Sequence, residues 1–151
     1  MWVASADNHE IVRIDPQANT VVSRTPVGDV DSLLTVGAGY GSVWAHQNAA
    51  ANGRGLVYRI DPATGNVLST LKASKPAGGR YGGTNISLAA GSVWVGNGNG
   101  TVSRITQDGS RVVRSVATPF LTEFIAVGLN SVWIQSDRGQ TARIPLTKFA
   151  G

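Results

Sequence analysis

Short runs of alternating hydrophobic and polar residues, separated by turn residues, fill most of the chain. Between residues 32 and 71 four such runs follow one another: SLLTVGAG, GSVWAH, LVYRID and NVLSTL. The first two meet at a Gly-rich junction and the last two at the segment DPATGN, and both junctions are typical of tight antiparallel turns. No helical periodicity extends beyond two turns. The sequence therefore predicts an all-β protein.

The same pattern recurs along the chain, and a Trp followed by an Arg-Ile pair marks each copy. The Trp residues are 42, 50 and 39 residues apart, a scale that indicates stacked or radially arranged units. A residue that recurs once per unit usually fills space between neighbouring units, so we expect all four Trp side chains to be buried and none to contact a ligand. The Trp residues are Trp2, Trp44, Trp94 and Trp133, and the Arg residues are Arg13, Arg59, Arg104 and Arg143.

Four antiparallel strands in each unit of this length are the blade of a β-propeller. We predict an incomplete ring of about three and a half to four blades. They span residues 1–27, which lack an inner strand, then 28–75, 76–118, and 119–151, which lack most of an outer strand. Propeller rings usually close when the two chain ends complete one blade, and no strand is left over for this. We favour a fragment of a longer propeller, whose missing remainder closes the ring, over two chains that associate as a homodimer.

The motifs GSVW and RIDPATGNVLST resemble the repeats of YncE-like, YVTN-type β-propellers, and more distantly those of streptogramin (virginiamycin B) lyases. The resemblance covers nearly the whole chain. It implies bacterial propellers that serve as enzymes, sensors or binding platforms, and somewhat favours an extracytoplasmic location. The repeat is also similar to that of quinoproteins, but Ser69 and Thr70 stand where those repeats have a stacking Trp. We therefore expect no pyrroloquinoline quinone and no other cofactor.

Composition narrows the function classes. The net charge is +4, but four of the thirteen basic residues are the repeated Arg residues, and no loop carries a basic run with interleaved aromatics. We therefore expect no nucleic-acid partner. The absence of Cys excludes disulfides and thiolate metal sites. No apolar stretch approaches the ~20 residues that cross a bilayer, so we expect no membrane insertion.

One face of the predicted propeller carries the variable loops, because the loops after the Trp strands and before the inner strands emerge together. Two of these loops, HQNAAANGRG and SKPAGGRYGGTN, account for the longest repeat. Function in repeat proteins often lies in such insertions, although solvated loops are the simpler interpretation. We expect a binding surface for an unknown small molecule or protein, with cations for an anionic group, an aromatic for stacking, and side chains that hydrogen-bond or ligate. The candidates are His46, Asn48, Arg54, Lys75, Arg80, Tyr81 and Glu123.

Catalysis is the competing hypothesis. The lyase resemblance implies a metal-assisted elimination with a histidine base and a carboxylate. However, His9 and His46 stand at different places in the repeat, so no catalytic residue can be carried over. Asp29, Asp31 and Glu123 offer oxygen ligands for a hard cation, and nothing in the sequence fixes their convergence. The sequence thus favours a non-catalytic binding or sensing scaffold, over a metal-dependent lyase or hydrolase and over the sensor domain of a larger regulator.

Overall fold

The computed structural model describes residues 1–28, 33–48, 55–74 and 85–151. Within these residues, fourteen strands form four antiparallel sheets, and the one helical segment is a short 3₁₀ turn. The strands are β1 (Trp2–Ser5), β2 (Glu10–Asp15), β3 (Thr20–Pro26), β4 (Leu33–Gly39), β5 (Ser42–Asn48), β6 (Leu56–Ile60), β7 (Val67–Lys72), β8 (Asn85–Ala89), β9 (Ser92–Gly96), β10 (Thr101–Thr106), β11 (Val112–Ala117), β12 (Phe124–Gly128), β13 (Ser131–Gln135) and β14 (Thr141–Pro145), followed by the 3₁₀ helix η1 (Leu146–Phe149).

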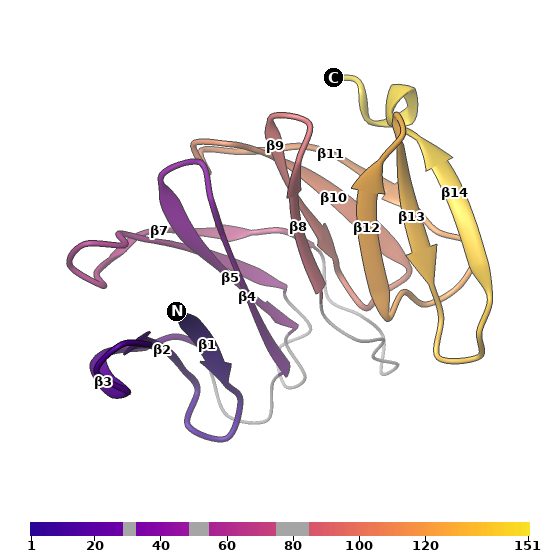
Figure 1. Ribbon diagram of the computed structural model, residues 1–151. Helices are drawn as coiled ribbons and strands as arrows, with labels where there is room; N and C mark the ends of the chain where they lie inside the picture. The colour runs from indigo at the N-terminus through magenta and orange to yellow at the C-terminus, as the bar shows by residue number, and fades with distance from the viewer. Residues whose placement is uncertain (29–32, 49–54, 75–84) are drawn as a thin grey trace.

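The four sheets succeed one another in chain order along an arc (Figure 1). Sheet 1 contains β1 to β3, sheet 2 contains β4 to β7, sheet 3 contains β8 to β11, and sheet 4 contains β12 to β14. In every sheet, strands that are consecutive in sequence are neighbours. The prediction of four-stranded antiparallel blades in an incomplete ring is therefore confirmed, with two complete blades between two three-stranded ones.

Two-residue turns join the first and second strands of the blades. In sheet 2 the turn residues Tyr40 and Gly41 both have positive φ angles, 53° and 68°, and Ala90 and Gly91 of sheet 3 repeat this with 49° and 65°. Two consecutive positive φ values define a type I′ turn, whose twist matches that of the strands it joins. Gly at the second position removes the steric cost there. These turns lie on one face of the protein, called here the turn face.

Aspartate side chains shape the turns between the third and fourth strands on the same face. The Oδ1 atom of Asp61 accepts hydrogen bonds from the backbone N–H groups of Ala63 at 2.7 Å and Thr64 at 3.3 Å. These donors hold the pKa of the Asp61 carboxyl below its usual value. Asp15 makes the equivalent bonds in sheet 1. The Asp-Pro motif is thus a turn-forming element.

The described residues form three hydrophobic core clusters, one between each pair of consecutive sheets. The cluster between sheets 2 and 3 surrounds Trp44, and the cluster between sheets 3 and 4 surrounds Trp94; each indole is 1% exposed. A strand exposes alternate residues to its two faces, so the Trp of one sheet faces the next sheet while the residues on either side of it, Val43 and Ala45 or Val93 and Val95, face the previous one.

Each Trp is paired with the Arg of its own sheet, and we call this pair the Trp–Arg latch. In all four latches the guanidinium carbon lies 5.8 Å from the centroid of the indole ring, within the range of a cation–π interaction. In sheet 2, Arg59 Nε also donates to Ser42 Oγ at 2.8 Å, and the indole of Trp44 donates to the carbonyl of Gly39 at 3.1 Å. The repeated Trp, Arg and Ser residues therefore form one structural unit.

The expectation that all four Trp side chains are equally buried is wrong. Trp133 is 37% exposed and Trp2 is half-buried. The side chain of Trp133 faces away from sheet 3, on the side where the described chain has no further sheet. Burial of a Trp at this position therefore requires a neighbouring sheet as well as the repeat sequence itself.

Candidate functional site

The structure places only some of the predicted site residues. His46 and Asn48 belong to β5, and Glu123 directly precedes β12. These residues lie at the face opposite the turn face, called here the loop face, where the strand that carries the Trp ends and the strand that carries the Arg begins. The remaining predicted residues lie outside the described part of the chain; they are Asp29, Asp31, Arg54, Lys75, Arg80 and Tyr81.

His46 is part of a strand, which corrects the interpretation that a loop begins there. It pairs with Thr35 of β4 and Val57 of β6, and it points toward sheet 3 because it lies two residues after Trp44. The imidazole is fully buried. Burial lowers the pKa of His46 to about 4, although a hydrogen bond with the backbone of Asn85 acts in the opposite direction. The side chain is therefore neutral at pH 7.

Three polar side chains converge around Gly55, just before β6. A Cβ atom at this position would lie 2.9 Å from Ser74 Oγ, 3.3 Å from His46 Nε2 and 3.6 Å from Asn97 Oδ1. Any side chain would displace Ser74, so the close approach requires glycine. We call His46, Gly55, Ser74 and Asn97 the Gly55 cluster. It lies where sheets 2 and 3 meet at the loop face.

The hydrogen bonds around Asn97 fix the orientation of its side chain. The hydroxyl of Thr101 donates to Asn99 Oδ1 at 2.6 Å, and the hydroxyl of Ser103 donates to the carbonyl of Ala73 at 2.8 Å. Both hydroxyl oxygens therefore accept from Asn97 Nδ2, at 2.9 Å and 2.8 Å. The amide oxygen consequently points into the Gly55 cluster. It is buried and has no hydrogen-bond partner among the described residues, which is a costly arrangement for an acceptor.

The corresponding place between sheets 1 and 2 is chemically different. Gln47 lies three residues after Trp44, as Asn97 does after Trp94, but Gln47 Oε1 accepts a hydrogen bond from the Tyr58 hydroxyl at 2.8 Å. The side chain of Gln47 also fills the space beside Gly28, where a Cβ would lie 2.9 Å from it. The amide oxygen is thus satisfied between sheets 1 and 2 and unsatisfied between sheets 2 and 3.

The Gly55 cluster suits an uncharged polar group. Asn97 Oδ1 accepts hydrogen bonds, the neutral imidazole of His46 carries no charge to repel a ligand, and Ser74 Oγ accepts from the N–H of Gly55 at 3.2 Å while keeping its own hydrogen to donate. Hydroxyl and amide groups match this set, because each both donates and accepts. Sequence reasoning placed Ser74 in a loop of this face but singled out neither Ser74 nor Asn97, since only the packing of two sheets brings them to His46.

Glu123 does not join this cluster. Its backbone N–H donates to the carbonyl of Gln135 at 2.8 Å within sheet 4, so sheet 3 lies between it and His46. Across the residues that the structure describes, no three His, Cys, Asp or Glu side chains are grouped as metal ligands would be. A search of the same residues finds no helix with the length and apolar character of a membrane span.

The turn face has an open hollow of about 610 Å³ beside the chain terminus. Arg104 and Asp108 line it. Both residues already serve the fold: Arg104 Nε donates to Ser92 Oγ at 2.9 Å, and Asp108 Oδ1 accepts from the backbone of Ser110 at 3.0 Å. This hollow is therefore a weaker candidate than the Gly55 cluster.

No family model matches the sequence and no curated protein matches it. Solved structures match its fold. The computationally designed Ika4 protein aligns with a TM-score of 0.73 at 14% identity, over 95% of this chain and 83% of that one. BamB from Moraxella catarrhalis aligns with a TM-score of 0.68 at 16% identity, over 92% of this chain and 38% of BamB. The Pan2 WD40 domain of Neurospora crassa also aligns at 0.68, with 15% identity, over 97% of this chain and 45% of that chain.

The chain therefore spans less than half of these two natural proteins and most of the designed one. Together with the four radially ordered sheets, the likenesses define a β-propeller fold. At this level of identity they show the fold alone. Membership of the YncE-like or streptogramin lyase-like families stays a prediction.

Proposed function

We propose that the chain is part of a non-catalytic β-propeller that binds a ligand or a partner protein on its loop face. The observation that carries the proposal is the orientation of Asn97, whose buried amide oxygen points into the Gly55 cluster without a hydrogen-bond partner among the described residues. Functional sites are places where a protein keeps polar groups that its own fold does not satisfy.

The remaining candidate residues extend this surface. The segments that carry Arg54, Lys75, Arg80 and Tyr81 join strands at the loop face, because Asn48 ends β5 and Asn85 begins β8 there. We propose that these charged and aromatic residues contribute to the same binding surface, because binding residues commonly lie on loops held by a rigid scaffold. Repeats that resemble those of YncE-like binding propellers support the same assignment.

A titration of the ¹⁵N-labelled chain with small probes tests the cluster. N-acetylglucosamine supplies hydroxyl and amide groups, and acetate serves as an anionic comparison. We expect N-acetylglucosamine to shift the side-chain amide signals of Asn97, with smaller effects of acetate. Asp15→Asn lies on the turn face and is the matched control, which leaves the shifts unchanged. Shifts confined to the turn face would show that the wrong face has been assigned.

The double variant Arg80→Ala with Tyr81→Ala tests the surrounding surface. For any ligand found by the titration, we expect about a tenfold loss of affinity, typical for the loss of a cation and an aromatic contact. The melting temperature should change by no more than a degree or two, because the described core clusters do not include these residues and substitutions outside a core usually alter stability by under about 0.5 kcal/mol. Unchanged affinity in this variant would exclude these two residues from the site.

A further inference from the structure

The Trp–Arg latches of the first three sheets each contact the next part of the chain. Arg13 Nη1 donates to the carbonyl of Ala63 at 3.2 Å, which joins sheet 1 to the Asp-Pro turn of sheet 2. Arg59 Nη1 donates to the carbonyl of Asp108 at 3.0 Å, which joins sheet 2 to the corresponding turn of sheet 3. Arg104 Nη1 donates to the carbonyl of Phe149 at 3.4 Å, in the segment after β14.

The latch of sheet 4 has the same internal geometry. Arg143 Nε donates to Ser131 Oγ at 2.7 Å, and the indole of Trp133 donates to the carbonyl of Gly128 at 3.3 Å. The face around it is apolar and open, because Phe124 and Trp133 are both exposed there. A hollow of about 160 Å³ between these two side chains marks the same surface. Sheet 4 therefore presents a formed latch for which the described chain offers no next sheet.

The side of sheet 1 that faces away from sheet 2 matches the exposed side of sheet 4. The residue immediately after the Trp faces the previous sheet, and in sheets 2, 3 and 4 it is Ala45, Val95 and Ile134, at 0%, 0% and 1% exposure. In sheet 1 the same position is Val3, which is 38% exposed. Val12 lies opposite Val3 on the same side of the sheet but is itself buried, at 6% exposure. The position after the Trp, which is covered in three sheets, is thus uncovered in the first.

The turn that would receive the latch is also present in sheet 1. Asp15 Oδ1 accepts from the N–H of Gln17 at 2.8 Å, as Asp61 Oδ1 accepts from the N–H of Ala63 at 2.7 Å. Gln17 is therefore the equivalent of Ala63, whose carbonyl receives Arg13. The backbone carbonyl of Gln17 therefore stands where the carbonyl of Ala63 accepts a hydrogen bond from the arginine of the preceding sheet.

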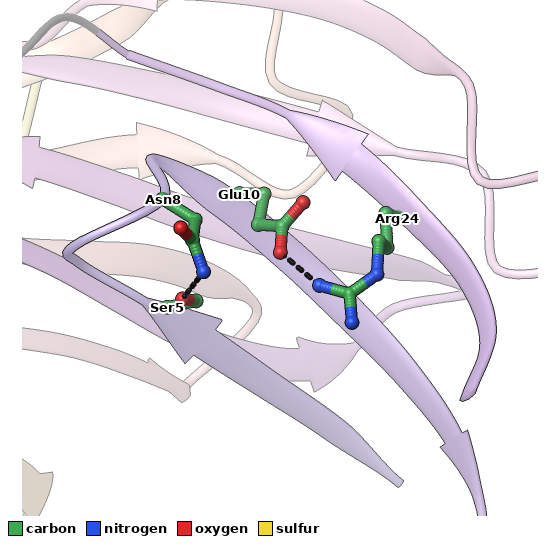
Figure 2. A network of polar contacts seen from close by, with 4 residues as sticks. All are labelled: Ser5, Asn8, Glu10 and Arg24. Carbon is green, nitrogen blue, oxygen red and sulfur yellow. Dashed lines mark hydrogen bonds and ion pairs between the residues drawn. The ribbon is translucent and has the colours of Figure 1, made fainter. Parts of the chain in front are cut away.

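Polar groups border the apolar surface of sheet 1 toward the loop face. Figure 2 shows the ion pair between Glu10 and Arg24, and the hydrogen bond from Asn8 Nδ2 to Ser5 Oγ at 3.2 Å. Glu10, which pairs with Ser5, shares the side of the sheet on which Val3 lies. On sheet 4 the residues nearest the loop face on this side are Gln135 and Thr141, beside Phe124, so polar side chains of both faces lie at the same end when the faces meet as consecutive sheets do.

We propose that the open face of sheet 4 packs against the open face of sheet 1 of a second copy of this chain. Trp133 then covers Val3 of the second copy, and Arg143 Nη1 donates to the carbonyl of its Gln17. The contact repeats the interface that already joins consecutive sheets within the chain. Because each copy carries both faces, two identical contacts form, and two copies build one ring. This surface is separate from the Gly55 cluster and does not depend on the proposed function.

Sedimentation equilibrium of the 151-residue chain tests the proposal. We expect a concentration-dependent species with twice the mass of the 15.7 kDa chain. Trp133→Glu should weaken this association by roughly 30-fold or more, which is typical for the loss of a buried Trp anchor. Leu68→Glu is the matched control, because Leu68 is an exposed apolar residue on the outer strand of sheet 2, and it should leave association unchanged.

A second pair of variants separates the interface from misfolding. Val3→Glu blocks the sheet 1 face, and Trp133→Glu blocks the sheet 4 face, so each variant alone should sediment as a monomer. Mixed together, they keep one intact contact between them and should form a heterodimer. A chain that stays monomeric at high concentration, or a mixture that does not restore association although both variants give native circular dichroism spectra, overturns the proposal.

Discussion

The ring of Phe149 stands edge-on against the ring of Trp94, with ring centroids 5.0 Å apart and an interplanar angle of 86°. Phe149 belongs to η1, close to the end of the chain, and its side chain is fully buried. The segment after β14 therefore forms no outer strand. It covers the latch of sheet 3, in the role that the turn around Gly109 has for Trp44.

Phe149→Ala should destabilise the chain by about 3 to 5 kcal/mol, because it removes a buried aromatic side chain together with its contact to Trp94. Phe124→Ala is the control, since Phe124 is exposed and should cost under about 1 kcal/mol in the monomer. Urea denaturation, followed by circular dichroism at low protein concentration, measures both. Equal effects would mean that η1 does not contribute to the core.

The Trp of the Trp–Arg latch should contribute differently to the free energy of unfolding in different sheets. We expect Trp94→Ala to cost about 3 to 5 kcal/mol, because a buried indole leaves a cavity, and Trp133→Ala to cost about 1 kcal/mol in the monomer. Both indoles make the same hydrogen bond and cation–π contact inside their sheets, so the comparison isolates the neighbouring sheet. A similar loss of unfolding free energy in both variants contradicts this account.

Two glycines with positive φ angles separate backbone strain from packing. Gly109 and Gly91 have φ values of 72° and 65°. A Cβ atom added at Gly109 would lie 3.0 Å from the ring of Trp44, whereas a Cβ atom added at Gly91 would have no other atom within 4 Å. Both Ala variants incur the cost of a positive φ, about 1 kcal/mol. We expect Gly109→Ala to lose at least a further ~1 kcal/mol by thermal denaturation. The reverse order would exclude close packing of this turn on Trp44.

The buried histidine should make stability depend on pH in a defined window. Burial lowers the pKa of His46 to about 4 in the folded state, from 6.5 when the chain is unfolded. The unfolded state therefore binds more protons between these values, so the contribution of neutral His46 is complete above pH 6.5 and is lost as pH falls toward 4, by about 3 kcal/mol. The surrounding side chains of Thr35, Ser74 and Asn97 are uncharged.

His46→Gln should remove this loss between pH 6.5 and 4 while retaining the fold. Asp15 and Asp61 provide an internal reference, because their pKa values are lowered from 3.8 and their contributions are lost only at lower pH. Urea denaturation of both proteins at several pH values checks the prediction. An identical slope in the two proteins across the window would show that His46 titrates normally.

Local sequence was sufficient to predict the strands, the turns and the blade class. Period-two patterns, Gly at positive φ and the Asp-Pro turns each act within one sheet, so a single repeat carries the information. Burial across sheets is different. Trp94 and Trp133 share the local motif Ser-Val-Trp and the same intrasheet contacts, yet Trp133 is 37% exposed and Trp94 is covered, because coverage depends on a neighbouring sheet.

For the candidate site, too, local features were predictable from the sequence and contacts across sheets were not. The sequence indicated the loop face and His46, but polar residues after the Trp strand suggested a loop at His46, where β5 instead continues to Asn48. The convergence with Ser74 and Asn97 depends on the packing of sheet 2 on sheet 3 and has no local signal. A polar residue stands three positions after the Trp in both sheets, Gln47 in sheet 2 and Asn97 in sheet 3, but the sequence does not distinguish the satisfied Gln47 from the unsatisfied Asn97.

Hydroxyl-radical footprinting of the Trp residues across protein concentrations tests the central claim most directly, namely that every sheet carries the same latch and that only the last one lacks a partner sheet within the described chain. Mass spectrometry reports the oxidation of each Trp separately. The account predicts that Trp44 and Trp94 stay protected at every concentration, and that Trp133 is oxidised in dilute samples and becomes protected as concentration rises. Oxidation of Trp133 that does not change with concentration, or oxidation of Trp44 as fast as that of Trp133, would contradict it.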